Sequence, residues 1–105
     1  MDILVSFQDC PPSEQVASKA RTAVRHALDR FSQRIREVRV KIRDQNAQKG
    51  GVDQRCSLSL AVHGQGELHL HETADNPEGA VHRLAKRAAR MLREGVRRLR
   101  RRRPD

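Results

Sequence analysis

The sequence contains no tryptophan and no tyrosine, and Phe7 and Phe31 are its only aromatic residues. The core must therefore be built from valine, leucine, isoleucine, alanine and methionine. This favours a sheet packed against helices with small apolar faces, and it argues against a deep ligand cavity. The scarcity of aromatic side chains also argues against recognition of single-stranded nucleic acid by base stacking on a sheet.

Cysteine is also scarce, and the two that are present, Cys10 and Cys56, do not form a CxxC motif. A single disulfide between them is open, but we interpret the chain as a reduced, cytoplasmic protein with Cys56 as a small apolar core residue. The N-terminal residues 1–12 lack the positive charge and the long apolar run of a signal peptide. No apolar run approaches the length of a membrane span, so we expect no membrane association.

Motifs of catalysis and metal binding are missing as well. The sequence has no nucleophile motif, no phosphate-binding glycine loop and no paired-carboxylate arrangement. We therefore expect no enzymatic activity, no cofactor and no small-molecule substrate. His63, His69 and His71 are expected on one strand face, but their predicted register keeps them too far apart for a metal site.

Positive charge is abundant and unevenly distributed. The 22 lysines and arginines outnumber the 13 acidic residues, which gives a net charge of +9. Residues 77–105 contain 11 basic and 3 acidic residues, so this segment alone carries +8. A basic excess favours nucleic acid, an anionic membrane surface or an acidic protein as partner, and its concentration in one segment indicates a dedicated contact element.

Apolar residues alternate with a period of two over residues 2–8, 35–44, 56–62 and 67–71, which predicts four strands. Helical spacing predicts a helix from the N-cap Ser13 to about Gln33. A second helix should run from Pro77 to about Arg100, with Asn76 as its N-cap. A three-residue loop over 64–66 would pair Val62 with Leu68 and Leu60 with Leu70, and would make the even positions one buried face. Residues 46–53, which include Gly50-Gly51, are expected to form a loop.

This element order predicts an α+β fold, βαβββα, with a four-stranded mixed sheet and both helices packed on one face. Each strand has one apolar face, so the other sheet face should be bare. Residues 1–101 should form a single domain, and residues 102–105 a frayed basic tail. The residues expected on the bare face are Arg39, Lys41, Arg43, Arg55, His63, His69 and His71.

The last helix combines an apolar stripe with a continuous cationic back. Because like charges at positions i, i+3 and i+4 repel, such a face loses local stability unless a partner supplies anions. Arginine suits phosphate, since its planar fork binds bidentately. We therefore predict phosphate contact, although a charged run can also be a solvated face. The helix positions predicted to contact RNA are Arg83, Lys86, Arg87, Arg90, Arg93 and Arg97.

The sequence resembles the ribosome hibernation-promoting factor family, which includes the ribosome-associated translation inhibitors. The likeness lies in the element order, in the run Arg43-Asp44-Gln45-Asn46 followed by Gly50–Cys56, and in the pair Ala80-Val81 that opens the last helix. The resemblance implies a stress-response factor that binds rRNA of the small ribosomal subunit near the decoding region, inhibits translation and promotes ribosome hibernation. It implies rRNA contacts from the last helix and from Arg39, Lys41 and Arg43 on the neighbouring strand.

Two other functions stay open on the sequence alone. One is a general basic nucleic-acid-binding protein that works through counterion release. The other is an adaptor whose basic helix docks an acidic protein. The sequence departs from the family at His82, where an acidic residue is common, and at residues 76–79, where an aromatic residue is usual. It does not indicate the oligomeric state.

Overall fold

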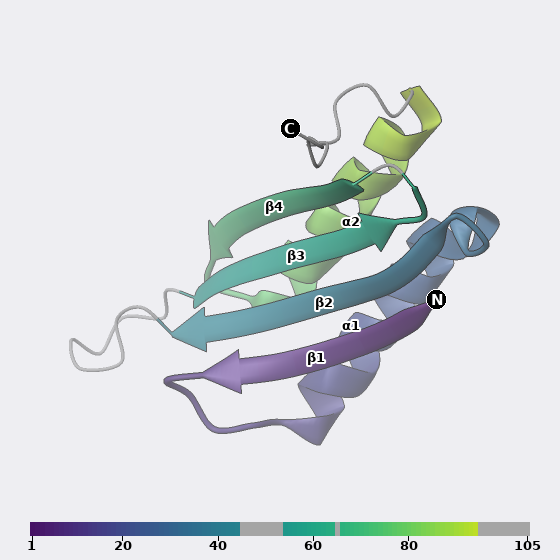
Figure 1. The fold of residues 1–105 in the computed structure, drawn as a ribbon. Coiled ribbons are helices and arrows are strands. Elements are labelled where there is room, and N and C mark those ends of the chain that lie inside the picture. Colours follow the sequence, from purple (N-terminus) through teal and green to yellow (C-terminus); the bar gives the residue numbers. More distant parts are fainter. Residues whose placement is uncertain (45–53, 65, 95–105) are drawn as a thin grey trace, which may run out of the picture.

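The computed structural model describes residues 1–44, 54–64 and 66–94. The elements follow the order β1 (Asp2–Gln8), α1 (Glu14–Leu28), a short 3₁₀ helix η1 (Asp29–Phe31), β2 (Ile35–Asp44), β3 (Gln54–Val62), β4 (Gly66–Ala74) and α2 (Pro77–Glu94). Figure 1 shows the four strands as one twisted sheet with α1 and α2 together behind it. The predicted α+β class and its βαβββα order are confirmed.

The sheet has the order β1-β2-β3-β4, so each strand lies beside its neighbour in the chain. β1 and β2 run parallel, whereas β2–β3 and β3–β4 are antiparallel, which makes the sheet mixed. Parallel neighbours need a long crossover, and α1 supplies it. From Val38 of β2 through β4 the even positions face the helices and the odd positions face away from them. At the start of β2 an irregularity between Ile35 and Glu37 shifts the register, and the odd-numbered Ile35 is buried in the core.

The core lies between the sheet and the two helices. It consists of aliphatic side chains and alanines, as the lack of aromatic residues requires. Small alanines on both helices allow the helix backbones to approach the sheet and each other closely. The least exposed side chains of the core include Val24, Leu28, Val38, Cys56, Leu58, Val81, Leu84 and Ala88.

The first helix begins as predicted but ends earlier. The Ser13 hydroxyl accepts a hydrogen bond from the Val16 amide at 3.2 Å, so Ser13 is the N-cap. The α-helix ends at Leu28 and not near Gln33, because the chain tightens into η1 there. The Ser32 amide donates to the Asp29 carbonyl at 3.0 Å, and this tighter winding places Phe31 in the core before β2 starts.

The β3–β4 hairpin has a different register from the predicted one. Leu60 pairs with Leu68 and Leu58 with Leu70, and the last pair is Val62 with Gly66. The loop is therefore not 64–66, and the pairing is shifted by two positions. A shift of two keeps the even positions on the buried face, so the apolar pattern fits both registers equally well. The glycine backbones fit the observed turn, since φ is 69° at Gly64 and 110° at Gly66.

The start of the second helix agrees with the prediction. The Asn76 side-chain oxygen accepts hydrogen bonds from the backbone amides of Glu78 at 2.9 Å and Gly79 at 3.3 Å. Asn76 is thus the N-cap, and Pro77 occupies the first helical position. The predicted extension to Arg100, the tail 102–105 and the loop 46–53 lie outside the described residues.

No helix in the described ranges has the length and apolar character that crossing a bilayer would require.

Cys56 is confirmed as a buried core residue, and it is a free thiol, as is Cys10. Its sulfur lies 3.8 Å from the Pro77 carbonyl oxygen, where β3 meets the start of α2. Burial raises the pKa of the Cys56 thiol from 9.0 to about 11, and the nearby Glu72 carboxylate adds to this effect. The thiol is therefore protonated and unreactive at neutral pH.

We expect this thiol to lower stability at alkaline pH. Between pH 9 and 11 the unfolded chain releases the Cys56 proton, while the folded domain retains it. The free energy of unfolding should therefore fall as pH rises through this window, by about 2 kcal/mol. Denaturant titrations at pH 8.5 and 11 would measure the fall. It should be much smaller in Cys56→Ala and only slightly reduced in Cys10→Ala, because Cys10 contributes to the shift less than burial and Glu72 do. Equal falls in both variants would refute the assignment.

Candidate nucleic-acid interface

The amphipathic character of α2 is confirmed over the described part of the helix. Its buried side chains are Ala80, Val81, Leu84, Ala85, Ala88 and Leu92. These residues recur at helical spacing and pack on the sheet and on α1. The basic side chains of the predicted site that α2 presents to solvent are Arg83, Lys86, Arg87, Arg90 and Arg93. Arg97, the sixth predicted helix residue, lies outside the described residues.

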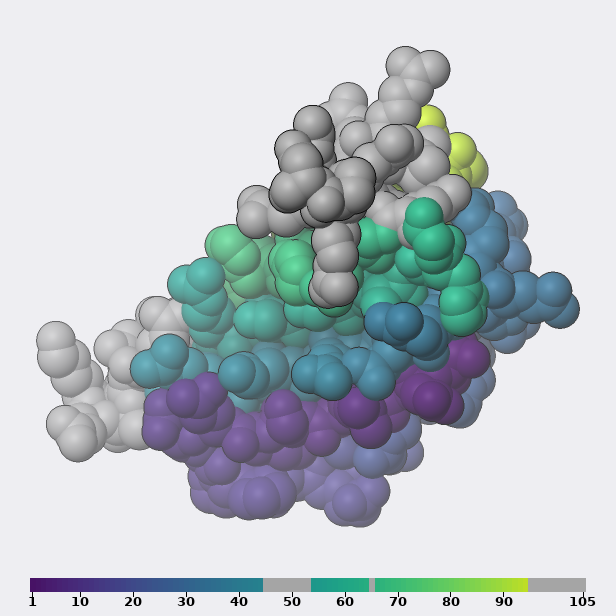
Figure 2. All heavy atoms as spheres, in the orientation of Figure 1, coloured from purple at the N-terminus to yellow at the C-terminus, as the bar shows by residue number. Residues whose placement is uncertain are grey.

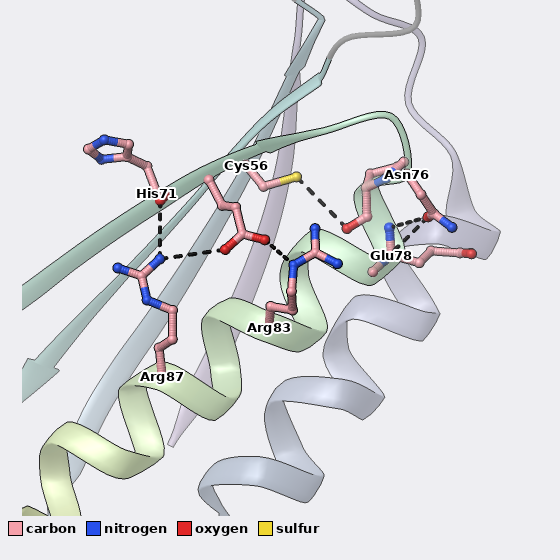
Figure 3. Close-up of polar contacts among 9 residues, drawn as sticks. Cys56, His71, Asn76, Glu78, Arg83 and Arg87 are labelled. Atoms are coloured by element: carbon pink, nitrogen blue, oxygen red, sulfur yellow. Dashed lines mark hydrogen bonds and ion pairs between the residues drawn. The ribbon is translucent and has the colours of Figure 1, made fainter.

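Two of these arginines lie against the outer strand β4. Arg83 and Arg87, one helical turn apart, both form ion pairs with the Glu72 carboxylate; the Arg87 guanidinium is 3.6 Å from it. Arg87 also donates to the His71 carbonyl at 3.4 Å. Figure 3 shows both guanidinium groups pointing from α2 toward the same part of β4. Both side chains are about half exposed, and their charge is partly neutralised by Glu72.

The other three helix residues lie next to α1. Lys86, Arg90 and Arg93 line an open groove between the two helices. We call it the interhelical groove and define it by its lining residues: His26, Ala27, Arg30, Phe31, Lys86, Ala89, Arg90 and Arg93. The exposed basic residues of α2 thus fall into two sets. Arg83 and Arg87 contact β4, whereas Lys86, Arg90 and Arg93 border the interhelical groove.

The strand residues lie on the far side of the sheet. Arg39, Lys41 and Arg43 are exposed on β2, on the face that neither described helix covers. Figure 2 shows this face, with the strands forming the surface side by side. Arg43 lies opposite Arg55 of β3 in the strand register. The bare sheet face is confirmed, and it is basic at its centre.

The partners of these strand cations differ. Arg39 pairs with Glu37 two positions away on the same strand, and Arg43 pairs with Asp9 at 3.2 Å. Lys41 has no ion pair with any described residue, and it lies between Ser6 of β1 and Ser57 of β3. Short side chains around a free ammonium group leave room for a phosphate to approach it.

The predicted site residues thus do not form one cluster. The sheet separates Arg39, Lys41 and Arg43 from the basic residues of α2, because the strand cations face away from the helices. A single flat partner can contact one set or the other. A partner that contacts both sets must surround the domain.

The three histidines do not converge on one point. The observed register places His69 opposite Ser59 and His71 opposite Ser57, which differs by two positions from the predicted pairing of β3 with β4. The His69 ring lies within hydrogen-bond distance of the Ser59 hydroxyl (2.9 Å) and of the Glu67 carboxylate (3.1 Å). Within the described residues, no group of three or more histidine, cysteine, aspartate or glutamate side chains could hold a metal ion.

Two basic residues of α1 and η1 lie beside the helix cations although they are not among the predicted site residues. His26 and Arg30 line the interhelical groove together with the cations of α2. Their place in the sequence could have indicated this. His26 and Arg30 each come directly before a residue of the apolar stripe, Ala27 and Phe31. Residues at the border of a helical stripe lie beside the neighbouring element, and His26 and Arg30 do so while staying exposed.

Comparison with known proteins identifies the same fold. The family model described as "Sigma 54 modulation protein / S30EA ribosomal protein" matches residues 3–100. The N-terminal domain of Protein Y from Thermus thermophilus superposes with a TM-score of 0.72 at 14% identity, covering 90% of this chain and 98% of that chain. A ribosomal subunit interface protein from Coxiella burnetii gives 0.73 at 13%, covering 90% and 96%. No curated protein sequence matches.

Proposed function

The chain belongs to the Sigma 54 modulation protein / S30EA ribosomal protein family, and on this basis we propose that it binds rRNA of the small ribosomal subunit near the decoding region and inhibits translation. In this way it would hold idle ribosomes in hibernation. The proposal places the protein in the cytoplasm and needs neither enzymatic activity nor a cofactor. The proposed contacts are Arg39, Lys41, Arg43, Arg83, Lys86, Arg87, Arg90, Arg93 and Arg97.

The observation that supports this proposal best is the presence of exposed cations on opposite faces of one small domain. Lys41 on the sheet, and Lys86, Arg90 and Arg93 on α2, form no ion pair with any described residue. A straight duplex would contact one of these faces and leave the other in water. A cleft in folded RNA offers phosphates on both sides, as a ribosomal subunit does.

The deciding experiment is co-sedimentation with ribosomes on sucrose gradients across a salt series, with excess tRNA as competitor. We expect the protein to migrate with small subunits at moderate salt and to resist the tRNA. A translation assay with the same preparation should then show inhibition. Loss of binding to the competitor would favour a general nucleic-acid binder, with a steep dependence of affinity on salt. Absence from every ribosomal fraction would favour an adaptor for an acidic protein.

Glu72 offers a gain-of-function test of the helix contacts. Replacing it with glutamine removes the charge that Arg83 and Arg87 share, so both become available to RNA phosphates. We expect roughly three- to tenfold tighter binding to small subunits. Stability should change by about 1 kcal/mol, because Glu72 is partly buried while both arginines remain in contact with solvent. Salt-dependent sedimentation would measure the gain.

The matched control is Glu14→Gln, which removes the same charge from a pair with Arg21 on α1, outside the proposed contacts. Its affinity should stay within twofold of the parent protein. Equal gains in both variants would mean that net charge alone sets the affinity, and that Arg83 and Arg87 contribute no specific contact.

A further inference from the structure

The two edge strands of the sheet, β1 and β4, are protected to different degrees. An edge strand exposes unpaired backbone amides and carbonyls, and charged side chains placed along it keep other strands away. At β4 the Arg87 side chain reaches from α2 and donates to the His71 carbonyl at 3.4 Å (Figure 3). Arg83 and Arg87 also pair with Glu72 of the same strand. A further strand would have to displace these arginines before it could pair with β4.

The outer edge of β1 lacks this protection. No described segment pairs with it, and Figure 1 shows β1 as the outermost strand on its side of the sheet. Asp2 is the only charged residue of the strand, which contains neither lysine nor proline. Residues 1–18 lack lysine and arginine altogether, although the whole chain carries +9. Two copies of this basic chain can therefore approach along β1 without aligning cations of the two edges.

β1 also leaves apolar side chains incompletely covered on both of its faces. Leu4 lies beside Arg39 on the bare sheet face. Among the described residues it is the one large apolar side chain that is mostly exposed, at 51%. On the helix side, four apolar residues pack against the core but are only partly buried: Met1, Ile3, Val5 and Phe7. A strand added at this edge would remove more of this apolar surface from water, which favours its binding.

The sequence of β1 is complementary to itself when two copies run antiparallel about Leu4. In this register Leu4 lies opposite Leu4 of the second copy, and Asp2 lies opposite Ser6, so no like charges meet. A register centred on Val5 would instead place Leu4 opposite Ser6. Such a self-complementary patch is what a twofold contact between identical chains needs. On the helix side the same register pairs partly buried apolar residues with each other: Met1 with Phe7 and Ile3 with Val5.

We propose that the outer edge of β1 pairs with β1 of a second copy of this chain, antiparallel about Leu4, and joins two four-stranded sheets into one. A contact along one short strand belongs to the small, transient class of interfaces, below about 1,200 Å², so we expect a dissociation constant on the order of 10–100 µM. The bare faces of the two copies would then continue into each other. The inference does not depend on the proposed function, because association is measured without ribosomes.

The test is sedimentation equilibrium of the full chain over a concentration series that brackets this range. Leu4→Lys places a cation at the centre of the contact and should weaken association at least about tenfold. The control His71→Lys adds a cation to the other edge strand and should stay within twofold of the parent protein. Both positions are exposed, so both variants should keep the thermal unfolding of the parent by circular dichroism. A monomer at every concentration, or equal association of the two variants, would overturn the inference.

Amide hydrogen exchange locates the contact without any substitution. In concentrated protein the outward-pointing amides of β1 should exchange more slowly than in dilute protein, while the amides of β4 should not change. Slower exchange at β4 in place of β1 would overturn the assignment. Protection of β1 that appears only when small ribosomal subunits are added would also overturn it, because the edge would then bind a ribosomal partner and not a second copy.

Discussion

Replacing Leu84 with aspartate is expected to unfold the domain. The Leu84 side chain is fully buried between α2 and the sheet, among the core residues Val81 and Ala88. Losing a buried leucine costs about 2–5 kcal/mol, and an unpaired buried carboxyl group adds several more. This sum is comparable to the whole stability of a small domain, which is about 5–15 kcal/mol. Circular dichroism should show the loss of cooperative thermal unfolding.

His82→Asp is the matched control, because it introduces the same residue two positions away on the exposed side of α2. We expect a change of less than about 0.5 kcal/mol. If Leu84→Asp and His82→Asp melted alike, near the parent temperature, the orientation of α2 described above would be wrong.

The second large effect is expected for binding. Lys86→Glu/Arg90→Glu reverses two cations that have no ion-pair partner among the described residues. Each charged contact is worth about 1.5–3 kcal/mol, so losing two should weaken binding to small subunits at least about 100-fold. Sedimentation at several salt concentrations would measure the loss. The fold should survive, since both side chains are exposed.

A second charge-reversal variant separates local contact from net charge. Arg25→Glu/Arg36→Glu changes the net charge by the same amount at two exposed positions outside the proposed contacts. Long-range attraction to RNA is then reduced equally in both variants, so the difference between them reports contact alone. We expect a loss of less than about tenfold for Arg25→Glu/Arg36→Glu. Losses of the same size in both variants would leave α2 without a specific role.

Much of the fold could be predicted because its signals are local. Ser13 and Asn76 mark the helix starts through side chains that cap the backbone within three residues. The strands follow from alternation, which one buried face enforces. The hairpin register and the end of α1 could not be read in this way. Pairing Leu68 with Leu60 or with Val62 buries the same side chains, and Phe31 fits the apolar stripe in either type of helix.

For the candidate site, the sequence could predict which side chains are exposed but not which residues they contact. The helical wheel showed that Arg83 and Lys86 both point away from the core. It could not show that Arg83 meets Glu72 of β4 while Lys86 meets the α1 side of the groove. Those neighbours depend on how α2 lies across the sheet, which side-chain periodicity within one helix does not determine. The position of His26 and Arg30 beside the apolar stripe of the first helix could be read from the sequence, but the α2 side chains across the groove from them could not.

The parallel pairing of β1 with β2 has a consequence for the order in which the domain folds. Partners in this pair, from Asp2 with Glu37 to Gln8 with Arg43, are all separated by 35 positions in the chain. By contrast, β3 and β4 pair outward from Val62 and Gly66 and can zip together from their turn. Closing the longer loop costs more chain entropy before any contact forms. During synthesis β1 leaves the ribosome first, because it is the N-terminal strand. It cannot pair in the sheet until α1 and β2 have also emerged.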